Sequence, residues 1–165
     1  MKKTEGTNLH QPITVLSVGP VEEDHLALSA ILADSRWPLC PGSEWTLETA
    51  PALQSALTIL TKKNIPLVVC ESDLGTASWR ELREHTVSLP DPPFLIVTSR
   101  LADEHLWAEA LNLGAYDVLA KPFDPVEVVR TLSQAWLHRS SRYTRKRNVP
   151  AVGRALPVPA TGVAV

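Results

Sequence analysis

Three short apolar runs in this chain each stop at a polar residue of a different kind: an acid at Glu71, a hydroxyl at Thr98 and an amine at Lys121. Continuous apolar runs of this length are typical of buried strands in a parallel sheet, and ligands of such sheets collect at the carboxyl ends of the strands. If the three runs are neighbouring strands, we expect the acid, the hydroxyl and the amine to meet in one crevice. Together they would suit an anionic group or an internal ion pair.

The elements that must position these residues can be read from apolar periodicity and turn residues. Strands alternate with helices along the chain, and this alternation predicts an α/β fold with a doubly wound, five-stranded parallel sheet flanked by helices, of the flavodoxin-like type. We expect strands at 13–18, 45–49, 67–70, 94–97 and 116–120, and helices at 22–34, 51–63, 78–87, 103–113 and from 125 to about 139.

Two helix ends carry clear local signals. Gly114 follows the fourth predicted helix, at a position well suited to a left-handed cap. Asp124, Pro125 and Glu127 have the types and spacing of an N-cap, a first-turn proline and a capping-box acid, and they predict the start of the last helix.

Charge is distributed unevenly along the 165 residues, whose formal net charge is −2. Sixteen Lys and Arg oppose eighteen Asp and Glu, yet no acid follows Glu127 and seven of the cations lie beyond it. We therefore predict a loose leader at 1–10, a folded domain at 11–139 and a basic, disordered tail at 140–165. The tail either is simply solvated or contacts nucleic acid.

Composition and motifs exclude several classes of function. Apolar residues make up 44% of the chain and charged residues 21%, as in a globular protein with a buried core. The two cysteines form no metal pattern, no run is long enough to span a membrane, and no signal-peptide core follows Met1, so we expect a cytoplasmic protein. No phosphate loop or nucleophile elbow is present, and we predict no enzymatic activity.

Four short segments at the predicted strand ends match a known family. The chain from about Ile13 to His138 resembles the receiver domain of bacterial two-component response regulators. The segments that carry this resemblance are Glu-Ser-Asp-Leu-Gly at 71–75 with Trp79 eight residues after Glu71, Val-Thr-Ser at 97–99, Gly-Ala-Tyr-Asp at 114–117 and Lys-Pro-Phe at 121–123.

The resemblance implies a role in phosphorelay signal transduction. In that family an acidic pair after the first strand and an aspartate after the third strand hold Mg²⁺, and the aspartate receives a phosphoryl group from a histidine kinase. Glu71 would stand at the phospho-acceptor position, and Thr98 and Lys121 would correspond to the residues that bind the phosphoryl oxygens. These roles fit the need of Mg²⁺ for oxygen ligands and of a phosphoryl group for positioned donors.

This chain departs from the family pattern at three places. Gly19 and Pro20 stand where the acidic pair is expected, Glu71 replaces the aspartate, and Val118 stands where an aromatic switch residue is frequent. We therefore predict a degenerate receiver, a pseudo-receiver that binds no cofactor and no Mg²⁺. Glu22 and Glu23 are weak candidates for substitute metal ligands.

Other interpretations stay open at this point. Asp73 could be the acceptor, but a two-residue shift would misplace Gly75 and Trp79. Glu71 either mimics a phosphorylated state by reaching Lys121 or forms an inert ion pair with it. A phosphorylatable receiver with non-standard metal ligands, and a nucleic-acid accessory protein that uses the basic tail, are the alternative functions.

A stand-alone receiver-like domain has to act through a contact surface. By resemblance this surface comprises the fourth helix, the fifth strand and the fifth helix, which would include Trp107 and Tyr116. We predict a protein partner, such as a histidine kinase or a downstream regulator, and no membrane association; a homodimer and nucleic-acid contact through the tail stay open.

Overall fold

A computed structural model of the protein describes residues 11–34, 37 and 39–147. The predicted leader at 1–10 lies outside these residues. Five parallel strands form one sheet in the order β2-β1-β3-β4-β5. The strands are β1 (Ile13–Val18), β2 (Trp45–Ala50), β3 (Leu67–Glu71), β4 (Phe94–Ser99) and β5 (Asp117–Ala120), and the helices are α1 (Glu22–Asp34), α2 (Leu53–Lys62), α3 (Trp79–Val87), α4 (Glu104–Asn112) and α5 (Pro125–Arg147).

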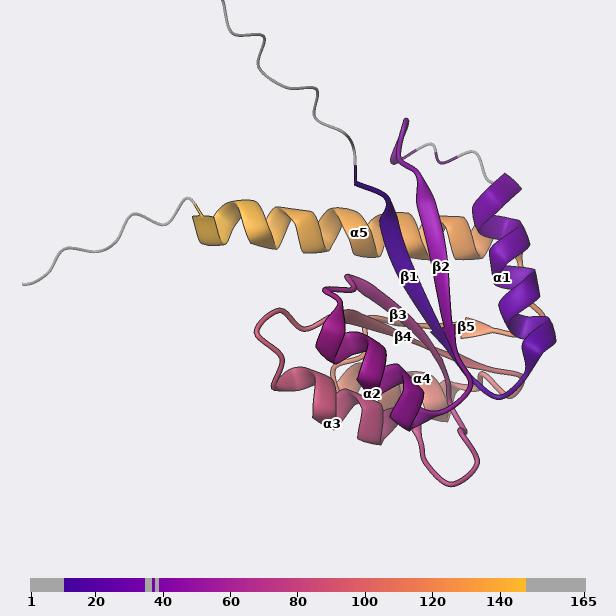
Figure 1. The fold of residues 1–165 in the computed structure, drawn as a ribbon. Coiled ribbons are helices and arrows are strands. Elements are labelled where there is room, and N and C mark those ends of the chain that lie inside the picture. Colours follow the sequence, from indigo (N-terminus) through magenta and orange to yellow (C-terminus); the bar gives the residue numbers. More distant parts are fainter. Residues whose placement is uncertain (1–10, 35–36, 38, 148–165) are drawn as a thin grey trace, which may run out of the picture.

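Helices cover both faces of the sheet (Figure 1). Because successive strand residues point to opposite faces, β3 contributes to two cores. Val68 and Cys70 pack with residues of α2, α3 and α4, whereas Leu67 and Val69 pack with residues of α1 and α5. These four side chains are almost completely buried, as expected for a central strand of a doubly wound sheet. The predicted fold class is confirmed.

Local signals locate the ends of several elements. The carboxylate of Asp124 accepts hydrogen bonds from the backbone N–H groups of Val126, at 2.8 Å, and Glu127, at 3.1 Å, and so caps the start of α5. Gly114 follows α4 with φ of 90°, a left-handed conformation that costs glycine little. Both predicted helix ends are thus present. The peptide bond between Lys121 and Pro122 is cis.

The last helix is longer than the sequence pattern predicts. It continues to Arg147, so residues 140–147 of the predicted disordered tail are helical, and residues 148–165 lie outside the described part of the chain. Apolar periodicity stops near 140, but Arg139 fixes the helix to the loop before β4 by bonding the carbonyl of Pro92 and the carboxylate of Asp91, each at 2.5 Å. Residues 140–147, which follow this anchor, are helical although they carry no apolar stripe.

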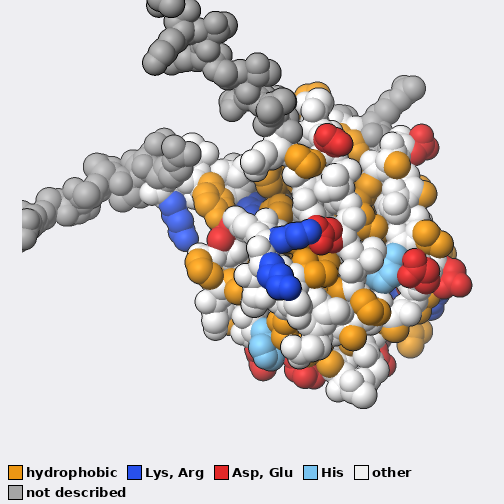
Figure 2. Space-filling model, viewed as in Figure 1, with side chains coloured by type: hydrophobic (Ala, Val, Ile, Leu, Met, Phe, Trp, Pro, Cys, Tyr) orange, Lys and Arg blue, Asp and Glu red, His pale blue; other side chains and the backbone are white. Residues whose placement is uncertain are grey.

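The extended end of α5 projects past the sheet (Figure 1). A space-filling view shows basic side chains on this projecting end and acidic side chains near the start of α1, on the other side of the molecule (Figure 2). Among the described helices, none is long and apolar enough to cross a membrane.

Candidate functional site

Strand register brings the three predicted residues to the same edge of the sheet. Glu71 at the end of β3 pairs in register with Thr98 of β4. The backbone N–H of Lys121 donates to the carbonyl of Ser99 at 2.9 Å, so Lys121 follows β5 directly beside the end of β4. Counting alternate residues from Val69 and Ile96 places Glu71 and Thr98 on the face covered by α1 and α5.

The ammonium group of Lys121 lies between two carboxylates. Its Nζ donates to Oε2 of Glu71 and, at 2.6 Å, to Oδ2 of Asp24. The Lys121 side chain is only 3% exposed, whereas those of Glu71 and Asp24 are 16% and 21% exposed. A buried ammonium needs such partners, because an unpaired charge out of water is costly. Both charged partners of the lysine therefore come from the chain itself.

Arg100 adds a second, weaker cation to this group. Its guanidinium lies 3.5 Å from Oδ1 of Asp24, and its side chain is 62% exposed. An exposed pair of this kind contributes little to stability. It does, however, balance the charge of the group, because two carboxylates then face two cations.

Asp24 is the site residue that sequence analysis missed. Its position in the first turn of α1 is also explained by the attraction between acids and a helix N-terminus, which hides any further role. A usable signal existed: Asp24 precedes the buried Leu28 by four residues, so both lie on the face of α1 that packs on the sheet. Glu22 and Glu23, the predicted substitute ligands, are exposed and form no ion pair with any described residue.

A buried histidine fixes the start of α1 over the sheet. His25 is 5% exposed; its Nδ1 lies 2.8 Å from the hydroxyl of Ser17, and its Nε2 lies 2.9 Å from the carbonyl oxygen of Gly19. A carbonyl only accepts, so Nε2 carries a proton and donates to Gly19. These two bonds hold the neighbouring Asp24 in reach of Lys121.

The residues at this edge do not fit a magnesium ion. Gly19 and Pro20 offer no side-chain oxygen, and the carboxylates of Glu71 and Asp24 are bonded to Lys121. A Cβ atom added to Gly19 would lie 3.2 Å from the Cβ of Glu71, so a larger residue there would crowd the acid. No group of three His, Cys, Asp or Glu residues within the described chain could hold a metal ion. Mg²⁺ prefers a near-octahedral set of oxygen ligands, which this edge does not supply.

The alternative acceptor Asp73 lies outside this group. It is exposed in the loop after β3, where its carboxylate accepts from the backbone N–H of Gly75 at 2.8 Å. Gly75 itself has φ of 82°, which the turn requires. Asp73 therefore shapes the loop that leads into α3.

Thr98 is the polar residue of this edge with a free hydroxyl. It is 3% exposed, and its hydroxyl forms no hydrogen bond with any residue that the structure describes. The neighbouring Cys70 is fully buried; burial raises the pKa of its thiol to about 12, so the thiol stays neutral beside Glu71. The edge thus combines a closed ion-pair group with one donor that has no assigned structural role.

The residues predicted for partner contact pack on different faces. Trp107 is half-buried against the core below α2, α3 and α4, while Tyr116 packs on the α1 and α5 face. The Tyr116 ring stacks on Phe94, with centroids 5.2 Å apart, and its hydroxyl lies 2.7 Å from Nδ1 of His138. Val118 is completely buried and cannot act as an exposed switch residue.

The sheet order and the polar carboxyl edge together define the class of the protein, a doubly wound flavodoxin-like fold with its polar group where such folds place ligands. Within this class, the solved structures that are similar to the chain include signal receiver domains. The chain is similar to the signal receiver domain of an HD domain-containing protein from Pseudomonas fluorescens, with 25% identity over 87% of this chain and 99% of that chain and a TM-score of 0.70.

Two further structures have the same fold. The chemotaxis response regulator CheY4 of Vibrio cholerae is 18% identical over 76% of this chain and 99% of its own, with a TM-score of 0.64. The beryllofluoride-activated receiver domain of DrrB is 16% identical over 77% of this chain and 99% of its own, also with a TM-score of 0.64. No protein-family model and no curated protein matches the chain. The chain has the fold of response-regulator receiver domains, as its motifs predict.

Proposed function

We propose that this protein is a degenerate receiver domain of two-component signalling, a non-enzymatic cytoplasmic module that acts by protein contact without phosphorylation and without Mg²⁺. The observation that carries the proposal is the engagement of Lys121 by both Glu71 and Asp24. In the family that the chain resembles, this lysine binds the incoming phosphoryl group. Here the chain's own carboxylates already occupy it.

The energetics favour a permanently closed group. Two unit charges at ~4 Å attract by about 4 kcal/mol at an effective dielectric of 20, and part of this is offset by desolvation. Opening the group to admit a phosphoryl group would expose Lys121 and place new negative charge beside Glu71 and Asp24. Without a divalent cation, the exposed Arg100 is the remaining cation among the described residues of this edge, and it already faces Asp24 at 3.5 Å.

The two carboxylates around Lys121 also bear on whether Glu71 mimics a phosphorylated state or forms an inert ion pair. One carboxylate lacks the two charges and three acceptor oxygens of a phosphoryl group. Glu71 and Asp24 together supply two negative charges to Lys121, which supports a constitutively fixed lysine rather than an empty receiver site. We infer that the partner-binding state does not depend on a signal at position 71.

Treatment with phosphoryl donors tests the proposal. The protein is incubated with Mg²⁺ and acetyl phosphate, and separately with beryllofluoride, and is followed by intact mass and by amide NMR spectra. We expect no adduct and no saturable shift of amide resonances. The DrrB receiver domain, which was solved in a beryllofluoride-activated state, serves as the responding control. A phosphorylated Glu71 or Asp73, or a saturable response to Mg²⁺, would instead support a working receiver with unusual ligands.

Substitution of Glu71 distinguishes mimic from inert pair. Glu71→Gln keeps the shape of the side chain but removes its charge, so Lys121 keeps Asp24 as its charged partner. If the charge of Glu71 mimics a phosphorylated state, affinity for a partner falls in this variant. Unchanged affinity would leave the inert ion pair as the correct interpretation.

A further inference from the structure

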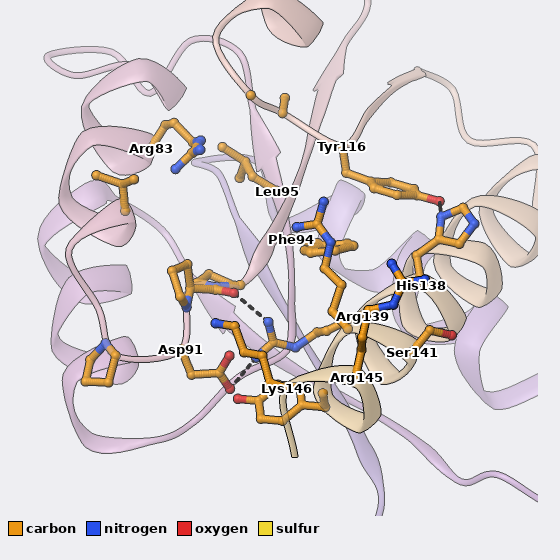
Figure 3. Close-up of a pocket in the computed structure, with 18 residues that line it drawn as sticks. Arg83, Asp91, Phe94, Leu95, Tyr116, His138, Arg139, Ser141, Arg145 and Lys146 are labelled. Carbon is orange, nitrogen blue, oxygen red and sulfur yellow. Dashed lines mark hydrogen bonds and ion pairs between the residues drawn. The ribbon is translucent and has the colours of Figure 1, made fainter. Parts of the chain in front are cut away.

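A groove of about 1100 Å³ lies at the edge of the sheet opposite to Lys121. It is formed by the end of α3, the loop and first residues of β4, the residues before β5, and the projecting end of α5 (Figure 3). Neither Glu71 nor Lys121 lines it. The groove is thus separate from the ion-pair group formed by Lys121, Glu71 and Asp24.

The floor and one wall of the groove are apolar. Phe94 and Leu95 at the start of β4 and Ala115 and Tyr116 before β5 form the floor, and Val87 at the end of α3, a residue that is 55% exposed, stands at the wall. The prolines of the loop that precedes β4 complete this surface; they are Pro90, Pro92 and Pro93. Covering this surface with apolar groups of a ligand would remove it from water, which is favourable in free energy.

The rim of the groove is cationic. Arg145 and Lys146 on α5 line it, are exposed and form no ion pair with any described residue. On the opposite side lies Arg83, whose Nε is buried and has no hydrogen-bond partner among the described residues (Figure 3). The lining contains one acid, Asp91, and its carboxylate is bonded to Arg139 at 2.5 Å. The excess positive charge is therefore not neutralised within the part of the chain that the structure describes.

The groove is held in shape before any ligand arrives. Arg139 is buried and bonds both the carboxylate of Asp91 and the carbonyl of Pro92, which ties α5 to the opposite wall. A preformed surface loses less conformational entropy on binding than a flexible one.

We propose that this groove binds an acidic peptide segment of a partner protein, with apolar side chains on the floor and carboxylates at the cationic rim. The inference rests on the proposed function in one respect, that a contact-acting domain needs a partner-binding surface. Charge complementarity selects an anionic partner, and the apolar floor selects a protein segment.

The aromatic residues argue against single-stranded nucleic acid as the occupant. Nucleic-acid grooves of this kind use free aromatic faces for base stacking. Here the guanidinium of Arg142 lies 5.2 Å from the centre of the Phe94 ring, and that of Arg139 lies 5.5 Å from the centre of the Tyr143 ring. Tyr116 is stacked on Phe94 and bonded to His138. Ring faces that base stacking would need are thus already covered, whereas the ring edges remain part of the apolar lining on which aliphatic side chains can pack.

Fluorescence anisotropy with designed peptides tests the proposal on the full chain. The probe is a short labelled peptide that alternates Glu with Leu; the matched probes replace every Glu by Lys, or every Leu by Ser. We expect saturable binding of the Glu-Leu peptide, no binding of the Lys-Leu peptide, and much weaker binding of the Glu-Ser peptide. Binding should weaken as salt is raised, because the rim charges are exposed.

Charge-reversed variants locate the binding site. Arg145→Glu/Lys146→Glu should reduce the affinity for the Glu-Leu peptide by about tenfold or more. The matched control Lys62→Glu/Lys63→Glu makes the same change of charge on exposed residues at the end of α2, outside the groove lining, and should leave the affinity almost unchanged. Val87→Asp, which places an acid at the apolar wall, should also weaken binding. Circular dichroism confirms that each variant is folded.

Three outcomes would overturn the proposal. They are no binding of the Glu-Leu peptide, equal loss of affinity in the groove and control variants, and tighter binding of a single-stranded DNA oligonucleotide that the groove variants abolish. The last outcome would assign the groove to nucleic acid. The phosphoryl-donor assay uses different reagents at the opposite edge, so a response there with intact peptide binding would overturn the proposed function and leave the groove in place.

Discussion

Lys121 shows how the partners of one residue restrict the chemistry of a whole edge. The sequence places an amine at the end of a strand, where it could bind a phosphoryl group, a carboxylate or solvent. In the structure its ammonium is buried and bonded to Glu71 and Asp24. Both of its charged contacts therefore come from the chain itself, and the proposed function rests on this arrangement.

Removal of the lysine should destabilise the protein more than removal of one acid. Lys121→Met leaves two carboxylates facing each other without their shared cation, and we expect a loss of about 2–4 kcal/mol in the free energy of unfolding, because both acids are partly solvated. Glu71→Gln leaves Lys121 paired with Asp24 and should cost about 1 kcal/mol. Urea unfolding at neutral pH measures both values. Equal losses in the two variants would show that Asp24 does not share the lysine.

At the scale of elements, the turn between α4 and β5 depends on one glycine. Gly114 has φ of 90°, and a Cβ atom there would lie 2.8 Å from Nη2 of Arg83. Gly114→Ala should therefore destabilise the protein by about 1–2 kcal/mol, from backbone strain and from displacement of Arg83. Thermal unfolding followed by circular dichroism measures the loss.

A second glycine provides the control for this substitution. Gly42 also has a positive φ, 76°, but apart from its chain neighbours no described residue has an atom within 4 Å of its added Cβ. Gly42→Ala should thus cost the backbone contribution alone and less than Gly114→Ala. The reverse order would mean that contact with Arg83 carries no penalty.

The long α5 depends on its anchor at Arg139. Arg139→Ala removes the bonds to Asp91 and Pro92, and because Asp91 can be rehydrated we expect a loss of about 1–3 kcal/mol, with faster hydrogen exchange in residues 140–147. Arg130→Ala is the matched control, since Arg130 is exposed on the same helix and, within the described part of the chain, bonds only Gln134, at 3.4 Å. Unchanged exchange in 140–147 after loss of Arg139 would show that the projecting end is helical without this anchor.

For the molecule as a whole, buried acids with raised pKa values set the response to alkaline pH. Burial raises the pKa of Cys70 from 9.0 to about 12, and burial also raises the pKa of Tyr116 above its ordinary value of 10.0. The unfolded chain loses these protons at lower pH than the folded chain. The stabilisation is therefore complete below about pH 9 and is lost as pH rises toward the folded-state values.

The expected slope is up to about 1.4 kcal/mol per pH unit for each such group. Urea unfolding between about pH 8 and pH 11 should show stability falling with pH, and Cys70→Ala should flatten the lower part of this curve. Stability that stays constant over the whole range would contradict the burial of these groups. The same burial predicts that Cys70 reacts with thiol reagents only after unfolding.

Charge is separated across the molecule at the same scale. The start of α1, with three acids in its first turn, lies at the carboxyl edge of the sheet, and the basic end of α5 projects beyond the amino edge (Figure 2). The net charge of −2 conceals this separation. Each edge therefore has its own electrostatic character, which is why the two proposals can be tested independently.

Much of the fold follows from short-range pattern. Residues 13–18 are β-branched and apolar between Pro12 and Gly19, and they form a strand with those bounds. Asp124 and Pro125 define the start of α5 as their types predict, because capping is a local interaction. The end of α5 could not be predicted in this way, since Arg139 acts through a loop 47 residues away.

The sequence by itself determined the alternation of strands and helices and the shared edge of Glu71, Thr98 and Lys121, because periodicity and strand ends are local properties that parallel pairing merely aligns. Only the tertiary structure decided that Asp24 completes the group, for 97 residues separate it from Lys121 and the packing of α1 sets the distance. The groove, likewise, exists only because a helix end, a loop and two strand starts meet in space. Contacts between distant segments depend on how elements pack, and no local pattern encodes that geometry directly.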